Sequence, residues 1–230
     1  MNNGDMNRAR AYYYEFFATP FLFSENDESF KIWQEQMKFL SQNPINESAK
    51  KAFDELMKFD FNAFKAEQND VLFNLSYANV PLTASFYEEG RDDGVARIRV
   101  IDILKKAGYV RNFDECKVSE DYVGFIFSAM AKLLGDEKVE LANELFKSVI
   151  NGFVDELCEM LDEHSRAKFY LAIKDIMSGF FELERAFLAL SAPFRDKSEL
   201  SPARIALNKK PYQSKMPTMK SKINMDEITL

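Results

Sequence analysis

Residues 119–134 read SEDYVGFIFSAMAKLL, and this stretch decides the fold class. Apolar residues recur at the spacing of one buried face of an α-helix. The residues of this face are Val123, Ile126, Phe127, Met130, Leu133 and Leu134. Ser119 can cap the helix, and Glu120 and Asp121 place negative charge at its positive end. The stretch predicts an apolar helix that begins at an acidic mouth, Glu120 and Asp121, which favours a binding protein over a catalyst.

The same helical periodicity extends through most of the chain. The 230 residues include only 8 Gly and 7 Pro, too few for the many turns of a β-fold. Helices are expected at about 7–18, 26–40, 46–59, 62–78, 85–89, 91–107, 119–134, 136–161 and 165–190. The first should end before Pro20, because the residue before a proline avoids the helical region. The sequence therefore predicts an all-α fold, with residues 1–200 forming a single-domain bundle of roughly eight to ten helices.

The composition changes near residue 200. Residues 201–230 contain six basic residues, two acidic residues and three prolines, with almost no periodic apolar pattern. We therefore expect a basic, flexible or loosely docked C-terminal tail. Its Lys209, Lys210 and Pro211 could lie across an acidic groove and imitate a basic partner, and the simpler alternative is a solvated tail.

Charge and cysteine content limit the possible partners and the compartment. The net charge is −7 and the tail contributes +4, so residues 1–200 carry −11. This acidity argues against a nucleic-acid partner and is compatible with a basic peptide, although it also simply favours solubility. Cys116 and Cys158 provide no disulfide framework. Without a signal-peptide pattern or an uninterrupted apolar span, the protein is expected to be cytoplasmic and not stably inserted in a membrane.

Motifs for catalysis or metal binding are absent from the sequence. It contains no P-loop, G-x-S-x-G, HExxH or dinucleotide-binding fingerprint. The single histidine, His164, lies in a predicted connection, and with two cysteines it makes no recognisable zinc or iron–sulfur ligand set. We expect no catalytic residues, no metal site and no cofactor. The alternative is a small helical enzyme or ligand-binding protein with an interior aromatic pocket.

Short motifs follow one another in an order typical of one protein family. They are Tyr13, Phe16-Phe17 and Pro20; Leu72-Phe73; Pro81-Leu82 with Ser85 and Tyr87; Ala107-Gly108-Tyr109; Glu120-Asp121-Tyr122 with Phe125, Phe127 and Met130; and Phe169-Tyr170 with Phe180, Leu183 and Glu184. Over about residues 8–192 the chain resembles the TorD/DmsD-type chaperones, which are related to the NarJ-type nitrate reductase assembly chaperones. It departs at Tyr122, where the family often has histidine, so a histidine-dependent step is not expected to carry over.

The resemblance implies an all-helical cytoplasmic protein that holds a molybdoenzyme precursor until its cofactor is inserted. Many members bind the twin-arginine signal peptide of their client. The implied client-binding residues are Leu72, Phe73, Leu75, Tyr77, Pro81, Leu82, Ser85, Tyr87, Glu120, Asp121 and Tyr122. The apolar members would line a groove, and Glu120 and Asp121 would pair with the arginines of the peptide. Reversing these two charges should then weaken peptide binding and leave the fold intact. The simpler alternative is that all of these residues serve only the structure, as core, loop and helix-capping residues.

The resemblance leaves the client and the assembly state open. The client would be a reductase of dimethyl sulfoxide or trimethylamine oxide, a formate dehydrogenase or a nitrate reductase, and the molybdenum cofactor would belong to that client. The chain would be a monomer or a helix-exchanged dimer, since the connections 79–85 and 113–118 are long enough for exchange. A structural subunit of a redox complex is a further alternative.

Overall fold

The computed structural model describes residues 3–23, 26–74, 79–196 and 198–208. The helices are α1 (Asn3–Phe21), α2 (Glu28–Ser41), α3 (Glu47–Leu56), α4 (Phe61–Leu72), α5 (Ala84–Glu89), α6 (Val95–Lys106), α7 (Val123–Gly135), α8 (Val139–Leu145), η1 (Phe146–Ile150, a π-helical stretch), α9 (Asn151–Glu163), α10 (Phe169–Leu188) and α11 (Pro202–Asn208). Within these ranges the only β-type pairing is an isolated bridge between Thr83 and Tyr122. The all-α prediction is confirmed.

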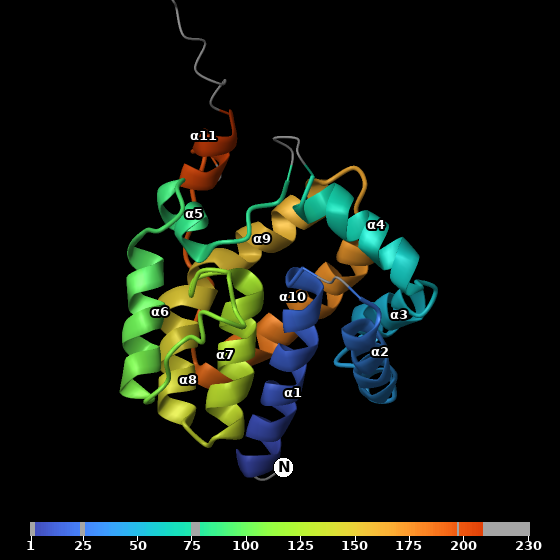
Figure 1. The fold of residues 1–230 in the computed structure, drawn as a ribbon, viewed down its shortest axis with the longest axis horizontal. Helices are drawn as coiled ribbons and strands as arrows, with labels where there is room; N and C mark the ends of the chain where they lie inside the picture. The colour runs from blue at the N-terminus through green and yellow to red at the C-terminus, as the bar shows by residue number, and fades with distance from the viewer. Residues whose placement is uncertain (1–2, 24–25, 75–78, 197, 209–230) are drawn as a thin grey trace, which may run out of the picture.

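The helices pack around a central pair. α1 and α7 lie side by side in the middle of the molecule, and α10 packs against α3 and α9. In Figure 1, α2, α3 and α4 lie on one side of this centre, and α5, α6 and α8 lie on the other. The predicted face of α7 is buried throughout, with Val123, Ile126, Phe127 and Met130 fully enclosed. The buried side of α7 follows from the apolar periodicity of its sequence.

The first helix is longer than predicted, because its proline is accommodated by other parts of the chain. Pro20 lacks an amide proton, so it cannot donate to the carbonyl oxygen of Phe16 one turn earlier. The indole Nε1 of Trp33 donates to that oxygen instead, at 2.9 Å. The carbonyl oxygen of Pro20 accepts from Gln68 at 3.1 Å and from Tyr170 at 2.6 Å. Three side chains from distant parts of the chain therefore donate hydrogen bonds to the carbonyl groups near the end of α1.

A charged pair lies among the aromatic residues that join α1 to α10. Arg10 is 3% exposed and Glu184 is 2% exposed, and Arg10 Nε lies 2.5 Å from Glu184 Oε1. Tyr14 donates to the second carboxylate oxygen at 2.8 Å, and Asn143 of α8 accepts from Arg10 at 3.0 Å. The hydrogen bonds compensate for the burial of both charges, so this network fixes α1 relative to α8 and α10.

Two further predicted boundaries, at α7 and α4, differ from the structure. α7 begins at Val123, with Tyr122 as its N-cap, so Ser119, Glu120 and Asp121 precede the helix instead of forming its first turn. α4 ends at Leu72, where the prediction continued to residue 78. α8, η1 and α9 follow one another without a break, which confirms that the helical pattern continues across Gly152.

The C-terminal segment contains a helix that the sequence analysis did not predict. Residues 202–208 form α11, which lies on α5, and Ala203 in its first turn is fully buried. The predicted basic tail is thus docked over its first residues. Residues 209–230, including Lys209, Lys210 and Pro211, lie outside the described part of the chain.

Candidate functional site

The structure brings several predicted site residues together where α5 and α7 begin. The amide of Ala84 donates to the carbonyl oxygen of Asp121 at 2.8 Å, and the amide of Val123 donates to Leu82 at 2.8 Å. Between these two bonds lies the Thr83–Tyr122 bridge. Residues 82–85 and 121–123, far apart in the sequence, are therefore cross-linked through their backbones.

The end of α4 approaches the same region. The amide of Val80 donates to the carbonyl oxygen of Val71 at 3.0 Å, which closes the connection between α4 and α5 next to Leu72 and Phe73. Of the predicted site residues, Leu75 and Tyr77 lie outside the described part of the chain.

Asp121 holds the start of α5. Its side chain is fully buried, and Oδ2 accepts a hydrogen bond from the amide of Ser85 at 3.2 Å. Among the described residues, Asp121 Oδ1 and Ser85 Oγ have no hydrogen-bond partner, although both atoms are buried. Asp121 thus connects the turn before α7 to the first turn of α5, and solvent does not reach its carboxylate.

Glu120 is buried between two arginines of the same chain. It is 6% exposed, and its carboxylate lies 2.7 Å from Arg97 Nε and 3.0 Å from Arg111 Nε. Burial raises the pKa of Glu120, but the hydrogen bond from Arg97 and the charges of both arginines outweigh burial and hold this pKa below its usual value. Glu120 is therefore an ionised, internally neutralised carboxylate.

The neighbouring carboxylates of α5 are also paired within the chain. Glu88 forms an ion pair with Arg99, and Glu89 lies 2.6 Å from Arg91. The expected open acidic mouth is thus absent from the described structure, since Glu120 is neutralised by arginines and Asp121 is enclosed. The expectation that reversing both charges leaves the fold intact needs correction, because it would place positive charge beside Arg97 and Arg111.

The apolar members of the predicted site divide by exposure. Leu72 and Tyr87 are each 4% exposed, and Tyr87 donates to the carbonyl oxygen of Pro81 at 2.8 Å. Phe73, Pro81, Leu82 and Tyr122 are only partly buried. Phe73 also contacts the exposed ring of Phe23 edge-on, with 5.2 Å between the ring centroids.

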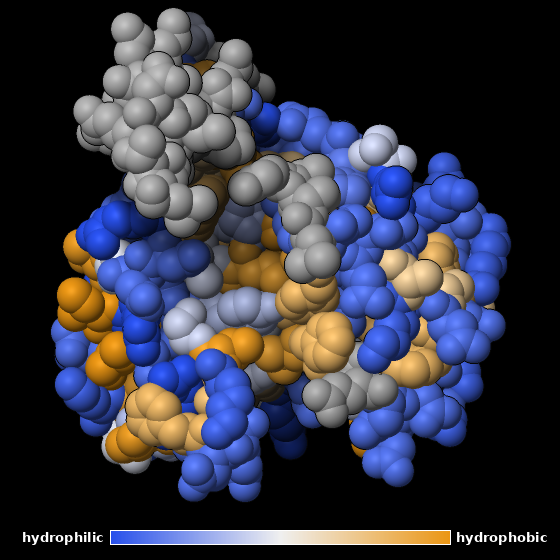
Figure 2. All heavy atoms as spheres, turned by 45° about the horizontal axis from the view of Figure 1, so that its top comes forward, coloured by the Kyte–Doolittle hydropathy of each residue, from blue (hydrophilic) through white to orange (hydrophobic). Residues whose placement is uncertain are grey.

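This end of the molecule carries apolar surface. The connection between α4 and α5 lies at the top of Figure 1, and Figure 2 turns that side toward the viewer. Apolar side chains gather there in a hollow in the middle of the face, between rims that are mostly hydrophilic. Such a hollow suits a partly apolar peptide segment.

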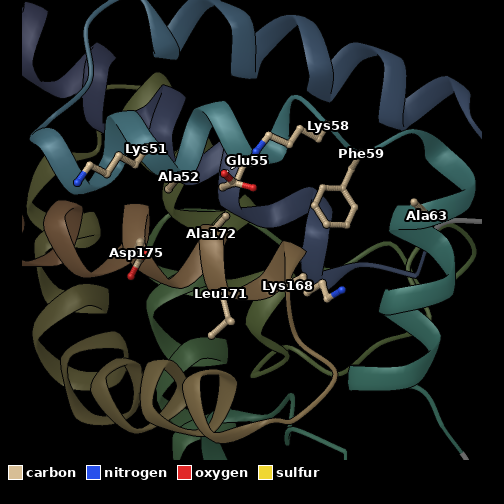
Figure 3. A pocket seen from close by; sticks show the side chains of 10 residues that line it. All are labelled: Lys51, Ala52, Glu55, Lys58, Phe59, Ala63, Lys168, Leu171, Ala172 and Asp175. Carbon is tan, nitrogen blue, oxygen red and sulfur yellow. Dashed lines mark hydrogen bonds and ion pairs between the residues drawn. The ribbon is translucent and has the colours of Figure 1, made fainter.

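A second hollow lies between α3, α4 and α10, as Figure 3 shows. This groove has a volume of about 520 Å³. Ala52, Phe59 and Leu171 provide apolar lining, and Lys51 and Lys168 lie at its rim. Glu55 and Asp175 also line this groove, so its charges are of both signs, and its apolar lining suits an apolar segment.

The interior aromatic residues pack against one another. Tyr14, Phe17 and Phe127 form ring contacts with Phe180 or Phe181, with centroids 5.1–6.2 Å apart. The groove of Figure 3 and a larger cavity beside α9 have Phe59, Tyr87 and Phe194 as their aromatic lining residues.

In the described ranges, no group of three or more His, Cys, Asp or Glu side chains is placed to hold a metal ion. No described helix is long and apolar enough to cross a membrane.

The described residues thus form an all-helical core with apolar hollows between its helices. Residues 33–167, from α2 to the turn before α10, match the family described as the nitrate reductase delta subunit. The chain belongs to this family, whose members are non-enzymatic chaperones of molybdoenzyme assembly related to NarJ and TorD. A comparison with curated proteins finds no match.

The two arginines that pair with Glu120 were not predicted from the sequence. Arg97 and Arg111 lie 23 and 9 residues from Glu120, so no local spacing connects them to it. A local signal for α11 did exist, since Ser201 is a suitable N-cap residue before Pro202 and a short run of helix-compatible residues.

Proposed function

We propose that this chaperone holds the precursor of a molybdenum-containing reductase or dehydrogenase in the cytoplasm. It binds the apo-form of the client, its twin-arginine signal peptide, or both, until the cofactor has been inserted and export can follow. The molybdenum cofactor belongs to the client, and the chaperone carries none. The family match over residues 33–167 is the observation that carries this proposal.

The exposure of the predicted site residues supports two different roles within the site. Phe73, Pro81, Leu82 and Tyr122 are partly exposed, so they are the members able to touch a client. The buried members Leu72, Ser85, Tyr87, Glu120 and Asp121 hold the connection and the two helix starts in place. We propose the first group as contact residues and the second as positioning residues. Leu75 and Tyr77 keep their sequence-based assignment.

The test is purification of the tagged chain from its native cytoplasm, with mass spectrometry of the proteins that accompany it. We expect a molybdoenzyme precursor that retains its twin-arginine leader. Recovery of mature complex subunits alone would overturn the proposal in favour of a structural subunit. Size-exclusion chromatography with light scattering of the same preparation separates the monomer from the helix-exchanged dimer.

Two matched variants connect the function to the site. Leu82→Glu places a charge on the partly exposed connection before α5, and we expect it to reduce recovery of the precursor. Ile32→Glu makes the same change on the outer face of α2, where Ile32 is 66% exposed, and should leave recovery unchanged. Equal recovery with both variants would move the contact surface away from the α4–α5 connection.

A further inference from the structure

The described residues of the C-terminal segment, 195–196 and 198–208, fold back onto α9 and α5, and we call them the C-terminal strap. Ser201 Oγ accepts from the amide of Arg204 at 3.2 Å and donates to the carboxylate of Glu156. The carbonyl of Pro202 approaches Gly90, where an added Cβ would lie only 2.6 Å from the carbonyl oxygen. The strap thus makes specific contacts with α9, through Glu156, and with the end of α5, at Gly90.

α9 presents a row of carboxylates to the strap. Glu156, Glu159 and Glu163 lie on one face of the helix, because residues three, four and seven apart share a face. This row is the α9 acidic face. Asp155 lies beside it and is paired with Arg185 of α10 at 2.9 Å, so it is already neutralised.

Two arginines of the strap occupy the α9 acidic face. Arg204 makes a two-pronged contact with Glu163, at 2.8 and 2.9 Å, and its guanidinium also lies 3.8 Å from Glu159. Arg195 lies 3.2 Å from Glu159 and 3.5 Å from Glu156. The segment thus binds α9 in the way expected of a basic peptide bound to an acidic surface.

The apolar anchoring of the strap is small. Ala203 is the only buried side chain that α11 contributes within the described residues. Within the strap, Leu200 is 57% exposed and Ile205 is 47% exposed, and Phe194, which directly precedes the strap, is 93% exposed. The pairs with Glu159 and Glu163 are partly exposed, since these two carboxylates are 47% and 59% accessible, and exposed pairs stabilise a fold only weakly. Glu156 is only 4% accessible beneath the strap, and undocking would return its carboxylate to water. Undocking of the strap therefore costs little compared with unfolding.

The strap also leaves space beneath it. A cavity of about 1000 Å³ lies between α9 and the strap. Its charged lining residues are Asp155, Glu156, Glu159, Asp196 and Glu199, with Arg195 and Arg204. Carboxylates therefore outnumber guanidiniums even with the strap in place, and Tyr87 and Phe194 add aromatic surface. This cavity therefore suits a segment that carries positive charge with apolar groups beside it.

We propose that the strap is an intramolecular occupant of a client-binding surface, and that an arginine-bearing basic segment of the client displaces it from the α9 acidic face. The inference rests on the proposed function, because it takes the client as the source of that segment. Displacement exchanges the pairs made by Arg195 and Arg204 for equivalent pairs made by the client. The strap thus excludes weakly basic peptides and yields to a segment with several arginines.

The test measures binding of a fluorescent synthetic peptide with two adjacent arginines followed by a leucine-rich stretch. For Arg195→Ala with Arg204→Ala, we expect binding tighter than wild type by about tenfold, since the surface is no longer occupied. For Glu159→Lys with Glu163→Lys, we expect binding weaker by about tenfold or more. Glu35→Lys with Glu140→Lys makes the same charge change at exposed positions elsewhere and should leave affinity near that of wild type.

Unchanged or weaker binding by the arginine variant would overturn the proposal, and so would unchanged binding by the α9 reversal variant. Binding by the arginine variant alone, with none by wild type, would support it strongly. Circular dichroism and thermal unfolding of each variant identify any loss of fold, and a second pair, Arg195→Gln with Arg204→Gln, should reproduce the gain in peptide affinity.

If wild type and the α9 reversal variant recover the same client precursor from cells, the proposed function stands and the strap inference falls. If no variant recovers a precursor, the proposed function itself fails.

Discussion

Arg10 and Glu184 form an ion pair inside the core, with 2.5 Å between Arg10 Nε and Glu184 Oε1 and almost no exposure of either side chain. The pair joins the first helix of the chain to the last long one. Removing one partner of a buried pair is costly because the other charge remains buried without compensation. Tyr14 and Asn143 also bind this pair, so each would lose a partner with it.

We predict that Glu184→Ala lowers the free energy of unfolding by roughly 3–5 kcal/mol. Replacing both charges, with Arg10→Met and Glu184→Leu, should recover most of this loss. Urea unfolding followed by circular dichroism measures both values. Arg8→Ala, which removes an exposed pair with Asp5, is the control and should cost less than about 1 kcal/mol. A small effect of Glu184→Ala would show that water reaches Arg10 in solution.

The bond from Trp33 Nε1 to the carbonyl oxygen of Phe16 substitutes for the amide that Pro20 lacks. Trp33→Phe removes this donor, and the unsatisfied carbonyl contributes about 1–3 kcal/mol to the cost of the substitution. With Pro20→Ala, the new amide of residue 20 can donate to Phe16 in the ordinary helical pattern. We therefore predict that Trp33→Phe costs about 1 kcal/mol less in the Pro20→Ala background. Equal costs in both backgrounds would show that the indole bond does not replace the helical one.

Close packing of α1 on α7 depends on Gly124. A Cβ at this position would lie 2.7 Å from Leu22 Cγ and 3.1 Å from the carbonyl oxygen of Ala18. Gly124→Ala should therefore lower the free energy of unfolding by about 1–3 kcal/mol, and Leu22→Ala in the same chain should relieve part of that loss. Gly152→Ala is the matched control, since no atom lies within 4 Å of an added Cβ there, and it should stabilise α9 by about 0.5–1 kcal/mol. Thermal unfolding of the variants gives the comparison.

Local patterns predicted much of this fold because they depend on neighbouring residues. The apolar face of 123–134 predicted the buried side of α7, and Asn46 was correctly expected to begin α3, where it accepts from the amide of Ala49 at 2.7 Å. Such features need no knowledge of the rest of the chain.

The errors arose where distant residues decide the local structure. Pro20 does not end α1 at residue 18, because Trp33, Gln68 and Tyr170 satisfy the carbonyl groups near it. Glu120 and Asp121 were wrongly expected to form an open acidic mouth, since both side chains are buried. The partners that enclose them come from α5, α6 and the connection after α6, and periodicity along one helix carries no information about such pairs.

The pairing of Glu120 with Arg97 and Arg111 predicts how stability depends on pH. The folded state lowers the pKa of Glu120, so folding favours the ionised form. The resulting stabilisation is fully present above the ordinary pKa of glutamate, about 4.3. It is lost as the pH falls through the lower, folded-state value. The stabilisation from Glu120 therefore disappears in acid. It does not change between pH 6 and pH 8, because these values are roughly two or more units above the ordinary pKa of glutamate.

We predict that Glu120→Gln is less stable than wild type by about 1–3 kcal/mol at pH 7, and that the difference narrows as the pH falls below about 4. Urea unfolding of both proteins at several pH values measures it. Glu35→Gln removes an exposed pair with Lys38 and should differ from wild type by less than about 1 kcal/mol at pH 7. A difference for Glu120→Gln that stays constant into acid would mean that the substitution acts through packing. The ion pairs with Arg97 and Arg111 would then contribute no net stability at neutral pH.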